Sequence, residues 1–170
     1  MIDLSTVDPG RPVRLAITPD RGEDGEGDLR RRVEAALTRG VNGVVFREKR
    51  LDDAEFLRIG REIRELCRER GVAFILNERE RAIPDLAPDA FQASFRTADL
   101  RTLRSIASVA KRNESELPLG ISVHDVDEGR ARIAEGYDFL VFGPLCATPS
   151  KKGLFEPRGL DALGQLAKGV

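Results

Sequence analysis

Short apolar runs of four or five residues recur along the chain, and most of them are bounded by polar or turn-forming residues. Runs of this length with such boundaries are typical of buried β-strands. They predict six strands, which the sequence places at residues 13–17, 43–46, 73–76, 90–93, 119–123 and 139–142.

Helical patterns lie between the strands. The stretch DLRRRVEAALTRG closes on Gly40 and the stretch DDAEFLRIGREIRELCRERG closes on Gly71, where a glycine favours the left-handed conformation that ends a helix. A sixth helix is predicted over LDALGQLAKG, from Leu160. Strands that alternate with helices form βαβ units with a parallel sheet and right-handed crossovers. Either an open doubly wound sheet or a (β/α)8 barrel satisfies this pattern.

The length of 170 residues predicts a single domain over residues 1–170. Six βα units stop short of the about 250 residues of a typical closed barrel, so the chain would lack the last two strands. A six-stranded sheet leaves two unpaired edges, and we therefore expect a homo-oligomer. The glycine-rich acidic stretch from Asp20 to Asp28 is interpreted as a mobile loop after the first strand.

The 28 basic and 29 acidic residues nearly cancel, so electrostatics gives no reason to expect nucleic acid or a membrane surface as a partner. No apolar run approaches the ~18 residues of a membrane span. The N-terminus shows no secretory signal, which predicts a cytoplasmic location. Cys67 and Cys146 lack the spacing of a metal site or a disulfide framework and are interpreted as free thiols. A small molecule is the expected partner.

Polar and charged residues follow the predicted strands at their carboxyl ends, where α/β folds of both kinds bind ligands. Arg47 and Lys49 come after the second strand and share the face of Val45, because side chains alternate along a strand. Asn77 and Lys151 fall at equivalent places on other units. A solvated loop would also explain this charged run, but several donors directed at one mouth favour a phosphate or pyrophosphate clamp.

His124 is the only histidine, and it follows Ser122 by two residues, so both side chains are predicted to face the same mouth. An isolated histidine is often structural, but an imidazole at a strand end also suits proton transfer near neutral pH. Asp125 and Glu128 have the spacing of a capping box and are interpreted as the start of a helix.

Carboxylates that could hold magnesium are few at the strand ends. Glu78 follows the third strand, but it also begins ERER, which a solvated helix face would explain equally well. Asp99 is as plausible in the first turn of a helix, where a carboxylate complements the helix dipole. A magnesium site would therefore depend on Glu78.

Five stretches, taken together and in order, resemble the superfamily of thiamin phosphate synthase and thiazole tautomerase. They are LAITPD at Leu15, GVNGVVFREK at Gly40, ELCRERGVAFILNER at Glu65, GISVHDVDEGRARIAEGYDFLVFGP at Gly120 and TPSKKG at Thr148. The resemblance covers nearly the whole chain. It implies a (β/α)8 TIM barrel, here truncated to about six βα units, and thereby decides between the two folds that the alternation allows.

The resemblance also implies roles for residues at the strand ends. In the synthase, a magnesium-bound pyrimidine diphosphate ionises, the thiazole phosphate traps the resulting cation, and pyrophosphate leaves. The residues that look like pyrophosphate ligands are Arg47, Lys49, Asn77 and Lys151. Those that look like contacts to the thiazole phosphate are Thr148 and Ser150.

The chain departs from the synthase pattern in three places. Val45 stands where synthases usually have glutamine, Glu78 where they have aspartate, and QASFRT where they have HLGQ followed by a magnesium-binding aspartate. Val45, Gln92 and the histidine of SVH instead resemble the tautomerase, whereas GPLCATPSK is closer to the synthase.

We therefore lean to a thiazole tautomerase that acts on thiazole phosphate. In this interpretation His124 moves the proton, Ser122 places the substrate, Gln92 contacts it, and no cofactor is required. The first alternative is a synthase, which also takes pyrimidine diphosphate and requires magnesium at Glu78. The second is a barrel fragment that binds phosphate ligands without catalysis.

Overall fold

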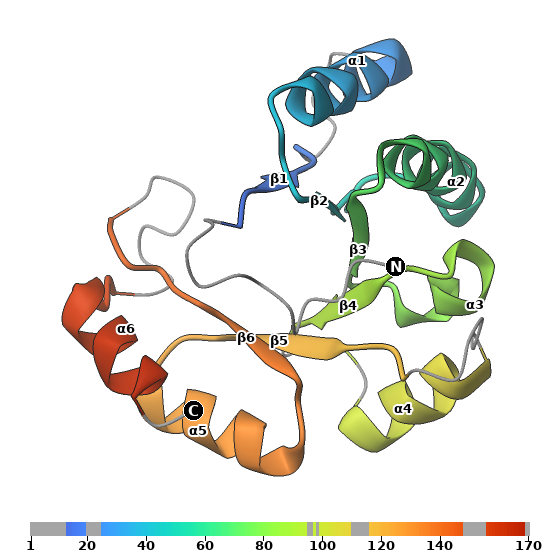
Figure 1. Cartoon of the computed structure of the whole chain (residues 1–170). Helices are drawn as coiled ribbons and strands as arrows, with labels where there is room; N and C mark the ends of the chain where they lie inside the picture. The colour runs from blue at the N-terminus through green and yellow to red at the C-terminus, as the bar shows by residue number, and fades with distance from the viewer. Residues whose placement is uncertain are drawn as a thin grey trace.

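The computed structural model describes residues 13–19, 25–94, 97, 99–109, 116–147 and 156–168, with the backbone alone at residues 25–28. Strands and helices alternate along these ranges (Figure 1). The strands are β1 (Leu15–Ile17), β2 (Gly43–Phe46), β3 (Ala73–Asn77), β4 (Ala90–Ala93), β5 (Leu119–Val123) and β6 (Phe139–Phe142). The helices are α1 (Gly25–Thr38), α2 (Asp53–Arg70), the 3₁₀ helix η2 (Glu80–Ala82), α3 (Ile83–Leu86), α4 (Leu100–Val109), α5 (Val126–Glu135) and α6 (Gly159–Ala167).

The strands form one six-stranded parallel sheet in which each strand pairs with its neighbours in sequence, in the order β1-β2-β3-β4-β5-β6. Figure 1 shows this sheet curled, with the helices on its outer side. β1 and β6 are the two edges, so the described residues form an unclosed barrel. This confirms the predicted α/β fold of (β/α)8 TIM-barrel type with about six βα units. The single domain over residues 1–170 and the homo-oligomer stay predictions.

The predicted element boundaries agree closely with the structure, because the residues that end an element act locally. β2, β4, β5 and β6 have the predicted bounds, whereas β1 begins at Leu15 and β3 extends to Asn77. Helix α2 begins after Asp52, whose Oδ1 accepts a hydrogen bond from the N–H of Glu55 at 2.9 Å. It ends at Gly71, which has the left-handed backbone predicted for it, at φ 63°.

Helix α1 begins earlier than the sequence predicts. Its helical backbone starts at Gly25, inside the stretch from Asp20 to Asp28 that was expected to be a loop. The apolar periodicity begins only at Leu29, which is buried. Periodicity marks the turns that pack against the sheet and not the turns that precede them. The loop prediction is therefore wrong for residues 25–28, and residues 20–24 lie outside the described part.

The hydrophobic core has two layers, one on each face of the sheet. Outward-facing strand residues such as Phe46, Phe74 and Phe91 are buried in a large cluster with the helices. Inward-facing residues form a second, smaller cluster inside the curl, made of Val45, Ala73, Ile75 and Ala90 with Phe139 packed against it. Alternation along each strand produces the two layers, because successive side chains point to opposite faces.

Phe139 reaches the inner cluster because residue 120 is a glycine. Gly120 and Phe139 are register partners on β5 and β6, and a Cβ atom on Gly120 would lie 2.2 Å from the Phe139 ring. The ring therefore lies where any larger residue would clash. Together with Val45 and Ala90 it forms an apolar floor beneath the polar residues that come next on the same face of the strands.

A repeated pair of hydrogen bonds fixes the register at the amino ends of the strands. The residue directly before each of β2, β4 and β6 is Asn or Asp. Its N–H donates to the carbonyl oxygen of a partner residue at or next to the start of the preceding strand. Its side-chain oxygen accepts a hydrogen bond from the N–H of that partner residue. The pairs are Asn42 with Arg14 (2.8 and 2.9 Å), Asp89 with Phe74 (2.9 and 2.8 Å) and Asp138 with Leu119 (2.8 and 2.7 Å). These contacts hold β1 and β2, β3 and β4, and β5 and β6 in register, so that the carboxyl ends of each pair lie side by side.

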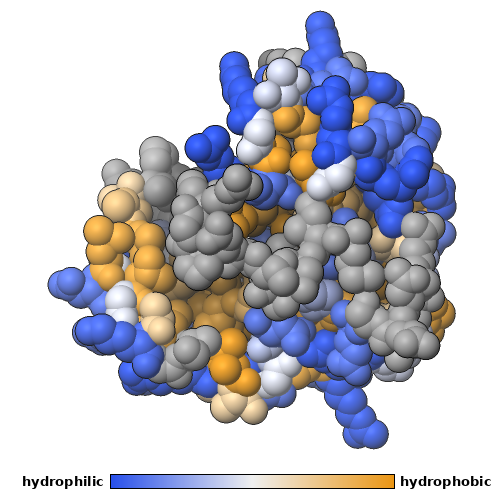
Figure 2. Space-filling view, viewed as in Figure 1, coloured by the Kyte–Doolittle hydropathy of each residue, from blue (hydrophilic) through white to orange (hydrophobic). Residues whose placement is uncertain are grey.

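The surface carries apolar side chains at the sheet edges and on the last helix. Leu15 and Ile17 on β1 and Val141 on β6 are exposed on the edge strands. Leu160 and Leu163 are exposed on α6, and Figure 2 shows apolar surface over that helix. Within the described ranges, no helix is long and apolar enough to cross a membrane.

Candidate anion-binding site at the strand ends

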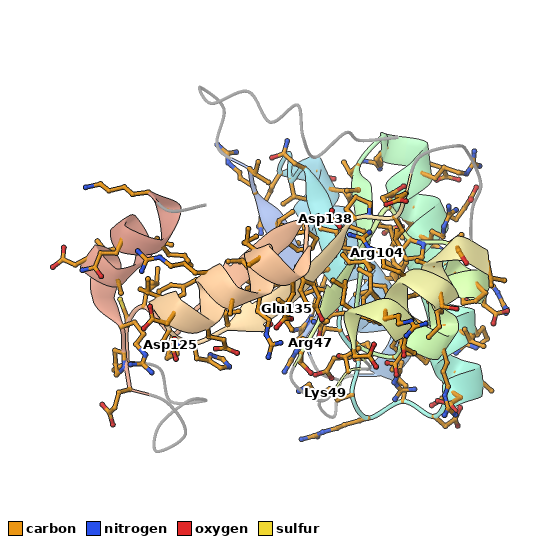
Figure 3. The ribbon with its side chains drawn as sticks, turned by 90° about the horizontal axis from the view of Figure 1, so that it is seen from below. Arg47, Lys49, Arg104, Asp125, Glu135 and Asp138 are labelled. Carbon is orange, nitrogen blue, oxygen red and sulfur yellow. The ribbon has the colours of Figure 1, made fainter. Side chains whose placement is uncertain are left out.

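Arg47 and Lys49 lie together just beyond the carboxyl end of β2. Figure 3 shows both side chains at the same end of the ribbon, away from Arg104 and Asp138. Lys49 is exposed and Arg47 half-buried, whereas Glu48 between them is only 2% exposed. Burial thus alternates past the strand, with the buried carboxylate between a half-buried and an exposed cation, which is consistent with the predicted alternation.

Thr18, at the carboxyl end of β1, holds the backbone of Arg47. The N–H of Arg47 donates to Oγ1 of Thr18 at 2.9 Å, and the same hydroxyl donates to the carbonyl oxygen of Arg47 at 3.3 Å. The N–H of Thr18 in turn donates to the carbonyl oxygen of Val45 at 3.0 Å. Thr18 is 3% exposed, so this attachment is shielded from water. It fixes the backbone from which the Arg47 side chain extends.

Three more polar side chains, one on each of β3, β4 and β5, belong to the candidate site. Asn77, 8% exposed, is the register partner of Gln92, and its Nδ2 donates to the carbonyl oxygen of Gln92 at 3.4 Å. The side-chain amide of Gln92 donates from Nε2 to Oγ of Ser122 at 3.0 Å. The structure therefore brings Asn77, Gln92 and Ser122 together, as their strand positions predict.

His124 follows Ser122 and is held at both its backbone and its ring. Its N–H donates to Oε2 of Glu128 at 2.7 Å, and Nδ1 lies 2.6 Å from the carbonyl oxygen of Gly143. A carbonyl oxygen only accepts, so Nδ1 carries the hydrogen in this contact. In the neutral ring Nε2 then has the lone pair and is the atom that could accept a proton.

The helix-start interpretation of Asp125 and Glu128 is confirmed. Oδ1 of Asp125 accepts the N–H of Glu128 at 2.8 Å, which caps α5. The Glu128 carboxylate reaches back to the N–H of His124, one residue before the cap. The capping pair therefore also orients the end of β5 that carries the histidine.

Glu78 follows β3 in a backbone conformation that the sequence does not predict. Glu78 and the next residue, Arg79, both have a left-handed backbone, at φ 58° and 54°. Such a conformation is uncommon for residues other than glycine and costs of order 1 kcal/mol or more for each. The expected helix face begins only at Glu80, so Glu78 stands before it at the strand end, with its side chain half-buried.

Asp99 acts at the start of a helix, the alternative that the sequence analysis left open for it. Its Oδ1 accepts the N–H of Thr102 at 3.0 Å and its Oδ2 accepts the hydroxyl of Thr102 at 3.1 Å. These hydrogen bonds hold the pKa of Asp99 below its usual value. Among the described residues, no group of three or more His, Cys, Asp or Glu side chains could hold a metal ion.

Three predicted contacts, Thr148, Ser150 and Lys151, lie outside the described residues. Two residues that the sequence analysis did not single out prove to support the site, namely Thr18 and Arg79. Thr18 could have been found, because a hydroxyl at the end of a strand next to a charged segment is a visible signal. Arg79 could not, because nothing in NER indicates two consecutive left-handed residues.

Comparison with known proteins identifies the family. The model of the thiamine monophosphate synthase family matches residues 15–170, nearly the whole chain. The chain belongs to this family. It is 30% identical over 156 residues to a putative thiamine-phosphate synthase of Geobacter sulfurreducens, covering 92% of this chain and 70% of that protein. It is 31% identical over 157 residues to the thiamine-phosphate synthase of Chloroflexus aurantiacus, covering 92% and 69%.

A solved structure supports the same fold. The thiamine phosphate pyrophosphorylase from Pyrococcus furiosus superposes with a TM-score of 0.76 at 23% identity, covering 93% of this chain and 71% of that one. The family resemblance read from the sequence is therefore confirmed. The names of these relatives favour the synthase alternative over the lean to a tautomerase.

Proposed function

We propose that this chain has thiamin phosphate synthase activity, in which pyrimidine diphosphate and thiazole phosphate are joined and pyrophosphate is released. The observation that carries the proposal is the row formed by Arg47, Lys49 and Asn77, which we call the anion clamp. Two cations and one amide extend from the adjacent ends of β2 and β3, within a family whose named relatives are synthases.

The chemistry of the anion clamp suits a leaving pyrophosphate. Charge develops on the diphosphate as its bond to the pyrimidine breaks, and donors already in place stabilise that charge without reorganisation. The guanidinium of Arg47 can bind two phosphate oxygens at once, whereas the ammonium of Lys49 acts as a point charge. Thr18 holds the Arg47 backbone by two hydrogen bonds, so this donor is fixed before the ligand arrives.

Magnesium fits this site as an ion shared between the protein and the substrate. Proteins often hold magnesium through only one or two carboxylates, with substrate phosphates and water as the other ligands. Glu78 supplies one carboxylate beside Asn77 at the end of β3 and would be the residue that holds the ion. When bound, magnesium would neutralise part of the charge on the leaving pyrophosphate.

Thiazole tautomerase activity remains the second candidate because of the contacts of His124. Nδ1 is fixed on the carbonyl oxygen of Gly143, which leaves Nε2 as the basic atom of the neutral ring. Ser122 lies on the same strand face, and Gln92 orients its hydroxyl from β4. A positioned acid–base group with a neighbouring hydroxyl is what a proton shift on a bound thiazole phosphate needs.

The test compares both reactions on the same protein. Wild-type chain is assayed for pyrophosphate release with and without magnesium, and for the proton shift of thiazole phosphate. A synthase releases pyrophosphate only with magnesium, and Glu78→Gln reduces that release strongly, whereas Glu62→Gln, on the exposed face of α2, does not. A proton shift without pyrophosphate release would favour the tautomerase. Binding of pyrophosphate without either reaction would favour the non-catalytic alternative.

A further inference from the structure

Arg79 is buried for the most part and contacts the segment that carries the clamp cations. Its side chain is 25% exposed and comes from the left-handed turn after β3. Nη2 donates to the carbonyl oxygen of Leu51 and, at 3.5 Å, to that of Lys49. The guanidinium thus spans the turn from Lys49 to the start of α2.

Two further contacts hold the guanidinium in place. Its Cζ atom lies 4.4 Å from the centre of the Phe56 ring, and Nη1 forms an ion pair with Oδ1 of Asp53 at 3.0 Å. Phe56 is buried in the core, so the ring is a rigid support. The Asp53 side chain is fully exposed, and its ion pair therefore adds little.

The segment 47–51 is consequently held from both neighbouring strands. Thr18 attaches Arg47 to the end of β1, and Arg79 attaches Lys49 and Leu51 to the end of β3. The left-handed backbone at Glu78 and Arg79 is consistent with this role. Residues in such conformations persist where the surrounding contacts fix them, as the contacts of the Arg79 side chain do here.

We propose that Arg79 is a positioning residue for the anion clamp, acting through the turn that carries Lys49 and not by touching the ligand. This inference rests on the proposed function, since it assumes that the clamp binds pyrophosphate. The action depends on the shape of the side chain. Nη2 donates to two carbonyl oxygens while Nη1 pairs with Asp53 and Cζ lies over Phe56, whereas a lysine has one nitrogen atom for all of these contacts.

The test is a double-mutant cycle with magnesium pyrophosphate as the ligand, measured by calorimetry on the full chain. Arg79→Ala is expected to weaken binding about fivefold or more. In the Lys49→Ala background the same change should have less than about a twofold effect, because the residue it positions is gone. A residue that only supports the fold would lower affinity equally in both backgrounds.

One variant separates the position of the Arg79 side chain from its charge, and a second variant is a control. Arg79→Lys keeps the cation, and its affinity should stay close to that of Arg79→Ala. Arg61→Ala removes an exposed arginine of α2 that pairs with Asp85 at 3.2 Å, and it should bind as the wild type does. Amide hydrogen exchange without ligand should speed up at residues 47–51 in Arg79→Ala and not at β5 or β6.

The outcomes distinguish the two proposals. If wild type binds pyrophosphate but Arg79→Ala binds equally well, or if the two substitutions are additive, the positioning role is wrong and the proposed function stands. Full recovery of affinity by Arg79→Lys also overturns it. If the wild type does not bind pyrophosphate, the proposed function fails and the inference fails with it.

Discussion

The Nδ1 atom of His124 lies 2.6 Å from the carbonyl oxygen of Gly143, so the ring at the end of β5 is fixed by the residue that follows β6. His124→Asn keeps a donor close to the position of Nδ1 but removes Nε2. If the chain is a synthase, pyrophosphate release by this variant should stay within about threefold of wild type. If it is a tautomerase, the proton shift should fall by about 10² to 10⁴-fold. Steady-state rates of both reactions in wild type and variant decide, and a collapse of pyrophosphate release in His124→Asn would contradict the expectation that the synthase reaction does not use Nε2 of His124.

The Asp138 carboxylate is expected to be a main support of the amino end of the sheet, where β5 and β6 begin. Its Oδ2 accepts Nη2 of Arg104 at 2.8 Å and the buried N–H of Leu119 at 2.7 Å, and Figure 3 shows Arg104 beside it. Asp138→Ala leaves both donors without this acceptor and should lower the free energy of unfolding by about 2 to 3 kcal/mol.

Urea unfolding measures this change, with two comparisons. Asp138→Asn keeps an acceptor oxygen and should cost less than the alanine variant. Glu62→Ala breaks only an exposed ion pair with Arg58 on α2 and should change stability by about 0.5 kcal/mol or less. An Asp138→Ala protein as stable as Glu62→Ala would show that the repeated register pairs contribute little.

Two glycines that face open space are expected to respond in opposite directions to alanine. Gly71 ends α2 at φ 63°, and no atom lies within 4 Å of a Cβ there, so Gly71→Ala should cost about 1 kcal/mol from backbone strain alone. Gly164 lies inside α6 with equally open space, and Gly164→Ala should stabilise the protein by about 0.5 to 1 kcal/mol. Thermal unfolding of both variants tests the pair, and a stabilised Gly71→Ala would be inconsistent with the cap.

Cys67 and Cys146 are expected to differ in reactivity. Burial, aided by the negative charge of Asp89, raises the pKa of the Cys67 thiol from 9.0 to about 12, whereas Cys146 is exposed. A thiol reagent at pH 8 should therefore modify Cys146 in the native protein and reach Cys67 only after denaturation, because the thiolate is the reactive form.

The same raised pKa predicts a loss of stability in alkali. The unfolded thiol loses its proton above about pH 9, whereas the folded thiol keeps it until about pH 12, so stability is fully present below pH 9 and decreases as pH rises toward 12. Cys67→Ala should show a shallower decrease over that range. Equal slopes for wild type and variant would contradict the burial of this thiol.

The strands and their caps could be predicted because each depends on residues close in sequence. GVVF, AFQA, LGISV and FLVF carry enough apolar side chains to define β2, β4, β5 and β6, and Asp52 and Gly71 define the ends of α2 without help from the rest of the fold. Gln92 and Ser122 were likewise candidates at neighbouring strand ends, and their side chains meet in the structure.

What could not be predicted depends on contacts between units. The attachment of Arg47 to Thr18 joins residues 29 positions apart, and that of Arg79 to Leu51 joins residues 28 apart. The backbone at Glu78 and Arg79 has no signal, because neither residue favours φ above zero. The curl of the sheet came only from the family resemblance, since alternating strands and helices also fit an open sheet.

Arg47 is the most important pyrophosphate ligand in the proposed function, and one calorimetric titration with magnesium pyrophosphate tests this role directly. Arg47→Ala should weaken binding at least about tenfold, because a lost charged hydrogen bond costs about 1.5 to 3 kcal/mol. Arg58→Ala, which removes an arginine paired with Glu62 on the exposed face of α2, should leave the affinity unchanged. Equal affinities for wild type, Arg47→Ala and Arg58→Ala would contradict the role of Arg47 as a pyrophosphate ligand. The charged segment after β2 would then be interpreted as a solvated loop.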